Sequence, residues 1–365
     1  MTEPLLVIAA GGTGGHMFPA QALAEAMLAR GWRVELSTDA RGARYAGSFP
    51  AAVTRRETRA QTFAQGSLVE RASTPFAIAA GAFATWRAMR RDRPACVAGF
   101  GGYPAVPAML AAGWLNVPVL IHESNGVLGR VNRRFAPKVD VVACGVWPTD
   151  LPARTKAVHV GNPVRAAVLD RAAAPYNVLG ETIGILVIGG SQGAGLFGRV
   201  VPEAVRLLPA DLRARLRIAQ QVRPEDMDKV RATYEEMGAA AELKSFFDDV
   251  PERLAEAALV VSRAGASSIA DIAVVGRPAI LIPYAAATDD HQAANAVGLV
   301  AAGGAFMIRE AELTPEGLAG TIEAILSDPD GAAAMAAASR AAGRPDATEH
   351  LAALVENLAG KGREA

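Results

Sequence analysis

The sequence predicts an α/β protein with two doubly wound domains. Short apolar strands alternate with helical segments along the chain, and a strand that runs into glycines occurs twice. LLVIAAGGTGG near the start is echoed by ILVIGGSQGAG at residues 185–195, about 180 residues later. Such repeated strand-to-helix units are typical of parallel, doubly wound sheets. At 365 residues the chain is long enough for two separate cores.

The remaining strands and helices follow in the same alternation. Their continuous apolar runs indicate strands that are buried on both faces of a parallel sheet. Helical periodicity is clearest in PAQALAEAMLARG and SSIADIAVVG. Further strands are expected at residues 32–38, 95–102, 117–123, 139–145, 216–222, 258–265 and 278–284, with helices at 19–31 and 267–276.

The charge distribution locates the domain boundary. Residues 1–163 hold 18 Lys and Arg against 10 Asp and Glu, a net charge of +8, whereas residues 164–365 hold 19 against 27, a net charge of −8. We therefore assign residues 1–163 and 164–345 to different domains, with the last helix, 346–362, crossing back to the first. A basic domain indicates an anionic partner, which is a nucleic acid, a membrane surface or a phosphorylated ligand.

Several classes of protein are disfavoured by composition. No apolar run reaches the roughly 18 residues of a spanning helix, and the first residues, MTEP, carry an acid where a signal peptide carries bases. We expect a cytoplasmic protein. Cys96 and Cys144 are interpreted as buried small apolar residues. No nucleic-acid-binding module is recognised.

The first glycine loop matches neither common nucleotide-binding motif. GGTGGH lacks the Lys and Ser or Thr of a P-loop, and Met17 stands where a dinucleotide fingerprint needs its third glycine. The second loop has the glycine spacing of the dinucleotide fingerprint, at Gly193, Gly195 and Gly198. The next strand, however, does not end in the acidic residue that would bind the ribose. Glycines still let backbone N–H groups approach an anion or a sugar. The alternative is a tight turn without a ligand.

Two later segments place polar side chains after buried strands. In SRAGASSIADI, Ser267 and Ser268 stand at a helix start, where they act either as caps or as diphosphate ligands. Asp271 either complements the helix dipole or accepts from a ribose diol. Polar residues 289–295 follow the next strand, at an edge where parallel sheets bind ligands.

A helical segment at residues 73–93 combines apolar and basic residues. Its apolar positions recur at helical spacing and its end is basic, with Trp114 in a nearby segment. Core packing is the usual explanation of such a stripe, and contact with an anionic membrane is the other. The residues concerned are Phe76, Ala79, Ala80, Phe83 and Trp86, followed by Arg87, Arg90, Arg91 and Arg93.

Seven motifs together resemble the MurG family of glycosyltransferases, over nearly the whole chain. They are GGTGGHMFPA, GFGGYPAVP, HESNGVLGRVNR, GNPVR, GGSQGA, SRAGASSIADI and DDHQAANA. The resemblance implies a GT-B fold, in which two Rossmann-like domains flank a cleft. It also implies inverting transfer of N-acetylglucosamine from UDP-N-acetylglucosamine, held by the second domain, to the C4 hydroxyl of undecaprenyl-diphospho-N-acetylmuramoyl-pentapeptide, held by the first. The product is the lipid-linked disaccharide precursor of peptidoglycan, lipid II.

The resemblance also assigns roles to individual positions. Asp271 stands where the family usually has Glu for the ribose hydroxyls, and His291 stands where some members have Gln. Donor-binding roles are implied for Thr13, Gly14, Gly15, Asn125, Arg165, Ser191, Phe247 through its backbone beside the uracil, Ala266, Ser267, Ser268, Asp271, His291 and Gln292, and an acceptor role for Tyr103.

Inversion needs a general base and stabilisation of the leaving diphosphate. His16 is the first candidate for the base, since an unperturbed histidine titrates near neutral pH, and Glu123 is the second. The alternative role of His16 is a structural hydrogen bond to the glycine loop. No Asp-x-Asp triplet lies in a suitable loop, so we expect metal-independent chemistry without a cofactor.

The implied setting is the cytoplasmic face of the inner membrane, with the protein bound peripherally. The expected partners are the UDP-sugar donor, the lipid-linked muramyl-pentapeptide acceptor, the anionic membrane surface and other cell-wall synthesis proteins, and no nucleic acid. Two alternatives stay open. A sugar-nucleotide 2-epimerase would act without an acceptor, and a non-catalytic donor-binding subunit would need a partner to supply the acceptor site.

Overall fold

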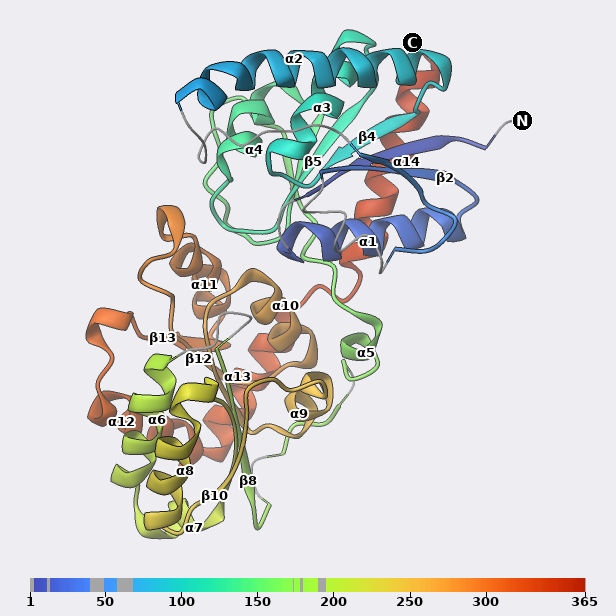
Figure 1. Ribbon diagram of the computed structural model, residues 1–365. Coiled ribbons are helices and arrows are strands. Elements are labelled where there is room, and N and C mark those ends of the chain that lie inside the picture. The colour runs from blue at the N-terminus through green and yellow to red at the C-terminus, as the bar shows by residue number, and fades with distance from the viewer. Residues whose placement is uncertain are drawn as a thin grey trace. The chain divides into compact units, whose positions relative to one another are not determined.

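The computed structural model describes residues 3–11, 14–39, 49–57, 68–172, 174–177, 180–189 and 195–364. The chain forms two compact units (Figure 1). Unit 1 comprises Met1–Val164 and Asp346–Ala365, and unit 2 comprises Arg165–Pro345. The chain therefore first passes from unit 1 to unit 2 one residue after the boundary expected from charge.

Unit 1 is built on a parallel sheet of seven strands in the order β3-β2-β1-β4-β5-β6-β7. Its neighbouring strands all pair in parallel. The order reverses between β1 and β4, which is the position at which doubly wound sheets bind their ligands. The strands are β1 (Leu5–Ala9), β2 (Arg33–Thr38), β3 (Thr54–Glu57), β4 (Cys96–Gly99), β5 (Val119–Glu123), β6 (Val141–Cys144) and β7 (Ala157–His159).

Helices cover both faces of this sheet. α1 (Gly14–Ala29) and α14 (Ala347–Glu364) contact each other on one face (Figure 1). Leu351 and Val355 of α14 are fully buried there in one core with Leu6 and Ile8. α2 (Leu68–Arg91) and α3 (Val106–Trp114) belong to the other face. The short α4 (Arg130–Phe135) follows β5.

Unit 2 repeats this design with six parallel strands in the order β10-β9-β8-β11-β12-β13. α6, α8 and α12 pack on one core, and α10 contacts α9, α11 and α13. The elements are β8 (Ile183–Ile188), β9 (Leu216–Gln221), β10 (Ala240–Lys244), β11 (Leu259–Ser262), β12 (Ala279–Leu281), β13 (Ala305–Met307), α5 (Ala166–Leu169), α6 (Gly195–Leu207), α7 (Ala210–Arg215), α8 (Met227–Glu236), α9 (Val250–Glu256), α10 (Ala266–Val275), α11 (His291–Ala301), α12 (Pro315–Leu326) and α13 (Pro329–Ala342).

The prediction of two Rossmann-like doubly wound domains is confirmed, with one clear correction. Helix α1 begins at Gly14, five residues before the expected start, and Pro19 lies inside it. The sequence favoured Pro19 as the start because proline is common in the first helical turn. The earlier start places His16 within the helix's first turn.

Candidate active site

The glycine loop of unit 1 is packed tightly between its neighbours. A Cβ on Gly11 would lie 2.6 Å from Cγ of Pro104 and 2.8 Å from Oδ1 of Asp39, so only glycine fits there. Gly101, after β4, has a φ of +94°, and a Cβ on it would lie 3.2 Å from Nε2 of His16. The loops after β1, β2 and β4 therefore meet around His16.

The structure gives His16 a defined hydrogen bond. Its Nδ1 lies 3.1 Å from the carbonyl oxygen of Gly11. A carbonyl only accepts, so in the neutral ring the proton sits on Nδ1 and the lone pair on Nε2. The structural hydrogen bond that was an alternative to the base role is present, and it leaves Nε2 as the nitrogen able to accept a proton.

Pro19 links this helix to the loop after β5. A proline has no N–H, so the carbonyl of Gly15, one helical turn earlier, lacks its usual donor. The hydroxyl of Ser124 donates to that carbonyl at 3.4 Å. The amide of Asn162 donates in turn to the carbonyl of Ser124 at 2.9 Å. The HESNG segment is thereby attached to the glycine loop.

Glu123 is buried at the end of β5 and organises the following loop. Its Oε1 accepts from the backbone N–H and from Nδ2 of Asn125, at 3.1 and 3.2 Å. Its Oε2 accepts from the N–H of Gly129 and from Nδ2 of Asn132, both at 2.9 Å. Both carboxylate oxygens are occupied, so this geometry favours a role in holding Asn125 over a role as base. Tyr103 begins the 3₁₀ turn after β4 and is half-buried.

In unit 2 the start of α10 suits an anionic ligand. Its N-cap is Gly265, and none of the described side chains caps it. The first N–H groups of the helix, from Ala266 to Ser268, therefore stay available, and the helix dipole favours negative charge there. Two other predicted donor ligands, Thr13 and Ser191, lie outside the described residues.

Two predicted donor ligands are close together in unit 2. Nη2 of Arg165 lies 3.7 Å from Oδ2 of Asp271. Burial raises the pKa of Asp271 to about 6, and the positive charge of Arg165 acts in the opposite direction. The side chain of Arg165 is 60% exposed and that of Asp271 is 16% exposed. Arg165, expected at the diphosphate, lies beside the carboxylate expected at the ribose.

The loop before α11 presents His291 and Gln292. It contains Asp289 and Asp290, which have left-handed φ angles of 53° and 50°. The Nδ1 of His291 lies 2.8 Å from the carbonyl of Thr288, and the Oε1 of Gln292 accepts from the N–H of Tyr284 at 2.9 Å. These bonds leave the Nε2 of His291 and the side-chain NH₂ of Gln292 for a ligand.

The loop after β10 contains Phe247. Its side chain is buried, and the guanidinium carbon of Arg253 lies 4.2 Å from the centre of its ring. This packing fixes the backbone that is predicted to lie beside the uracil.

The sequence interpretation missed three polar residues at these loops. Asn132 joins Glu123 near His16, and a buried Arg263 pairs with Glu310 at the end of the second sheet. The available signals were the second asparagine in HESNGVLGRVNR and an arginine directly after an apolar strand. The motif contains both Glu123 and Asn132 but does not show that they pair, and the partner of Arg263 comes from a distant part of the chain.

On α2 the predicted apolar stripe lies mostly at the surface, although Trp86 is half-buried and packs against the core. Phe83 is 54% exposed and stacks on Trp86, with ring centres 5.3 Å apart, and the guanidinium of Arg90 lies 5.1 Å from the Trp86 ring. Ala82, Thr85 and Met89 are the buried residues of this stretch.

Other predicted membrane residues are also at the surface. Arg87, Arg91 and, at the end of α3, Trp114 are exposed, while the side chain of Phe76 lies outside the described part. Among the described helices, none combines the length and apolarity needed to cross a bilayer.

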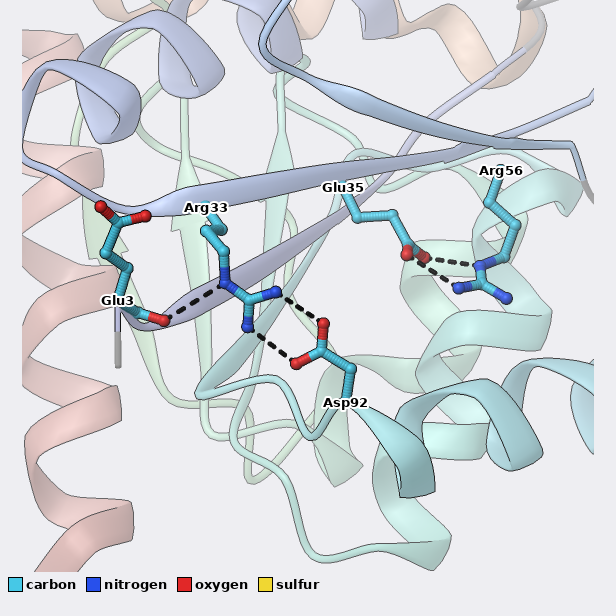
Figure 2. A network of polar contacts seen from close by, with 5 residues as sticks. All are labelled: Glu3, Arg33, Glu35, Arg56 and Asp92. Carbon is cyan, nitrogen blue, oxygen red and sulfur yellow. Dashed lines mark hydrogen bonds and ion pairs between the residues drawn. The ribbon is translucent and has the colours of Figure 1, made fainter. Parts of the chain in front are cut away.

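A cavity of about 370 Å³ lies at the opposite, amino edge of the first sheet. Figure 2 shows Arg33, which lines it, bound to both carboxylate oxygens of Asp92 at 2.7 Å. The neighbouring Arg56 binds both carboxylate oxygens of Glu35 in the same way. The cavity is remote from the loops that carry His16, so we do not assign it to the active site.

Comparison with known proteins identifies the family. The glycosyltransferase family 28 N-terminal domain matches residues 6–144, and the C-terminal domain of that family matches residues 184–351. A UDP-N-acetylglucosamine--N-acetylmuramyl-(pentapeptide) pyrophosphoryl-undecaprenol N-acetylglucosamine transferase of a Chelativorans species is 47% identical, over 98% of this chain and 96% of that protein. The chain belongs to the MurG family of glycosyltransferases. The resemblance noted from its motifs is therefore confirmed.

Further relatives of this MurG-family chain agree. The transferase of the same name from Rhizobium etli is 46% identical over 98% of this chain and 96% of that protein. The crystal structure of Acinetobacter baumannii MurG has a TM-score of 0.80 and 30% identity, covering 98% of this chain and all of that one. The chain is thus a glycosyltransferase, and the individual roles of its site residues stay predictions.

Proposed function

We propose that this protein transfers N-acetylglucosamine from UDP-N-acetylglucosamine to the C4 hydroxyl of undecaprenyl-diphospho-N-acetylmuramoyl-pentapeptide, with inversion at the anomeric carbon. The observation that carries the proposal is the 47% identity, over nearly the full chain, to a transferase named for this donor and acceptor. The geometry of His16 and of α10 supports it, since inversion requires a base and a site for the leaving diphosphate.

In the proposed reaction the acceptor hydroxyl attacks C1 of the donor sugar opposite the UDP. The bond between C1 and the diphosphate oxygen breaks, and UDP leaves with the electron pair. The hydroxyl proton passes to Nε2 of His16, which the bond from Nδ1 to Gly11 leaves unprotonated in the neutral ring. The base is thus held in one orientation by the backbone of its own glycine loop.

Donor binding is proposed for unit 2. The N–H groups at the start of α10 bind the diphosphate, the ionised Asp271 accepts from the ribose hydroxyls, and the backbone of Phe247 lies beside the uracil. His291 and Gln292 donate to the sugar. Charge on the departing UDP is stabilised by these N–H groups and by Arg165, without a metal ion or a cofactor.

Unit 1 is proposed to bind the lipid-linked acceptor and the membrane. The exposed Phe83 and the half-buried Trp86, with the arginines at the end of α2, match a surface that inserts aromatic rings at an anionic leaflet. We place the protein on the cytoplasmic face of the inner membrane, bound peripherally beside its substrate and other cell-wall synthesis proteins.

The decisive experiment measures UDP release from UDP-N-acetylglucosamine in EDTA, with and without the lipid-linked muramyl-pentapeptide. We expect release only with acceptor, together with a disaccharide product. Release without acceptor, accompanied by an epimerised free sugar, would assign the chain to the epimerases. Loss of activity in EDTA that Mg²⁺ restores would contradict the metal-independent mechanism.

The base is tested by His16→Ala in the same assay. We expect kcat to fall by about 10²–10⁴-fold, the usual contribution of a general base, with the donor KM changed less than about threefold. His350→Ala is the matched control, because His350 lies on the exposed side of α14. A kcat within about twofold of the parent protein would exclude His16 as the base.

A further inference from the structure

Arg263 is a buried cation that connects the ends of three strands in unit 2. It follows β11, and its side chain is only 9% exposed. Its Nη1 donates to the carbonyls of Ile282 and Pro283 after β12, both at 3.3 Å. The same nitrogen donates to Oε2 of Glu310, after β13, at 2.9 Å. Arg263 therefore holds together loops that are far apart in sequence.

Glu310 fixes the chain after β12 at a second point. Its Oε2 also accepts from the N–H of Ala285 at 2.9 Å. Burial acts to raise the pKa of Glu310, but the bonds from Ala285 and Arg263 outweigh it and lower the pKa. The carboxylate is thus ionised at neutral pH, and it holds both a charged donor and a backbone donor.

The backbone held by Glu310 is the backbone that orients Gln292. The N–H of Tyr284, one residue before Ala285, donates to the Oε1 of Gln292 at 2.9 Å. Two consecutive N–H groups are therefore fixed, one by Glu310 and the other by Gln292. A shift of this peptide segment would turn the Gln292 amide, since the amide has the Tyr284 N–H as its anchor.

We propose that Glu310 is a positioning residue for recognition of the donor sugar. Acting through Arg263 and the N–H of Ala285, it sets the backbone of Tyr284 and thereby the direction in which Gln292 presents its NH₂ group. This inference rests on the proposed function, in which Gln292 binds the sugar and the nucleotide is bound elsewhere in unit 2. Loss of Glu310 should therefore affect sugar binding and spare nucleotide binding.

The test compares the dissociation constants of UDP and of UDP-N-acetylglucosamine for the full chain and for Glu310→Gln. The substitution keeps the size of the side chain and removes its charge. We expect the constant for UDP-N-acetylglucosamine to rise about tenfold, as for the loss of a charge-assisted hydrogen bond, and that for UDP to change less than about twofold. Glu312→Gln, at an exposed carboxylate in the same turn, should change neither.

Each result decides the proposal. Unchanged binding of both ligands would overturn it, and so would an equal loss for both, because a general weakening of unit 2 does not distinguish sugar from nucleotide. Should Glu310→Gln fail to fold, Glu310→Asp keeps the charge on a shorter side chain and should show a smaller loss for the sugar nucleotide alone. Failure of the parent protein to bind UDP-N-acetylglucosamine would instead count against the proposed function.

Discussion

The two units stabilise their loops with buried charges of opposite sign. In unit 1 the carboxylate of Glu123 accepts from N–H groups of the loop that leads into α4. In unit 2 the fully buried guanidinium of Arg277 donates to the carbonyls of Leu254 and Ala255 at the end of α9, and of Val275 and Gly276 at the end of α10. It also donates to the carbonyl of Pro175 at 3.0 Å.

This difference follows from which backbone groups each loop leaves unpaired. A chain entering a helix has free N–H groups, whereas a chain leaving a helix has free carbonyls. A carboxylate can satisfy the former, and a guanidinium with its five donors can satisfy the latter. The sign of the buried charge is therefore set by the helix end that it serves, although both units share one sheet topology.

The largest expected effect is at Arg277. Arg277→Met keeps much of the volume but removes the guanidinium that donates to carbonyls at two helix ends, so the free energy of unfolding should fall by at least about 3 kcal/mol. Urea unfolding measures this change. Arg231→Met, at an exposed arginine of α8, serves as the control and should stay within about 0.5 kcal/mol of the parent. An equally small loss of stability for Arg277→Met would contradict the role of this buried guanidinium in unit 2.

Glu123→Gln tests the other side of the comparison. The amide replaces one accepting oxygen by a donor that faces N–H groups, so we expect about 2 kcal/mol less stability and weaker acceptor-dependent turnover, because Asn125 loses its anchor. Glu25→Gln, at an exposed carboxylate of α1, should alter neither. Abolished turnover with full stability would instead assign Glu123 the role of base, its alternative from the sequence.

The central strands of both sheets could be predicted from the sequence, and the edge strands could not. β3, β7, β10 and β13 were not expected, and these four are the outermost strands of their sheets. A central strand is covered on both faces and gives an apolar run. An edge strand such as TRRE at Thr54–Glu57 is largely exposed and carries charges.

The site was predicted only in part, for a related reason. Motifs identify residues that follow a strand, such as His16 and Asp271, since each lies within a recognisable segment. They do not identify long-range partners. Glu310 lies 47 residues from Arg263, in a segment without glycine or periodicity, and only the fold brings the two together.

The pH dependence of stability is expected to reveal Asp271. Its pKa is raised from the ordinary 3.8 to about 6, so between these values the folded protein binds a proton that the unfolded chain has lost. Stability of the parent relative to Asp271→Asn should therefore fall as pH rises from 4 to 6, by roughly 2 kcal/mol. Urea unfolding of both proteins at pH 4 to 7 gives this difference. A constant or rising difference would contradict a pKa of Asp271 that burial raises in spite of Arg165.

The smallest expected effect concerns the surface of unit 1. Joint replacement of Phe83 and Trp86 by Ser should weaken binding to vesicles that contain phosphatidylglycerol by at least about fivefold, while donor affinity stays the same. Phe306→Ser removes an exposed aromatic of unit 2 and should leave sedimentation with vesicles unaltered. Equal binding by the double variant and the parent would reject membrane contact through α2.

The return of α14 to unit 1 fixes an order in which the molecule is completed during synthesis. Unit 2 is one continuous stretch, Arg165–Pro345, so a ribosome has made all of it before the first residues of α14 are joined. The buried Leu351 and Val355 belong to the same core as β1, which was translated more than 300 residues earlier. During synthesis the first part of the nascent chain therefore cannot complete its core until the last helix is made. Unit 2, in contrast, contains all the residues of its own core.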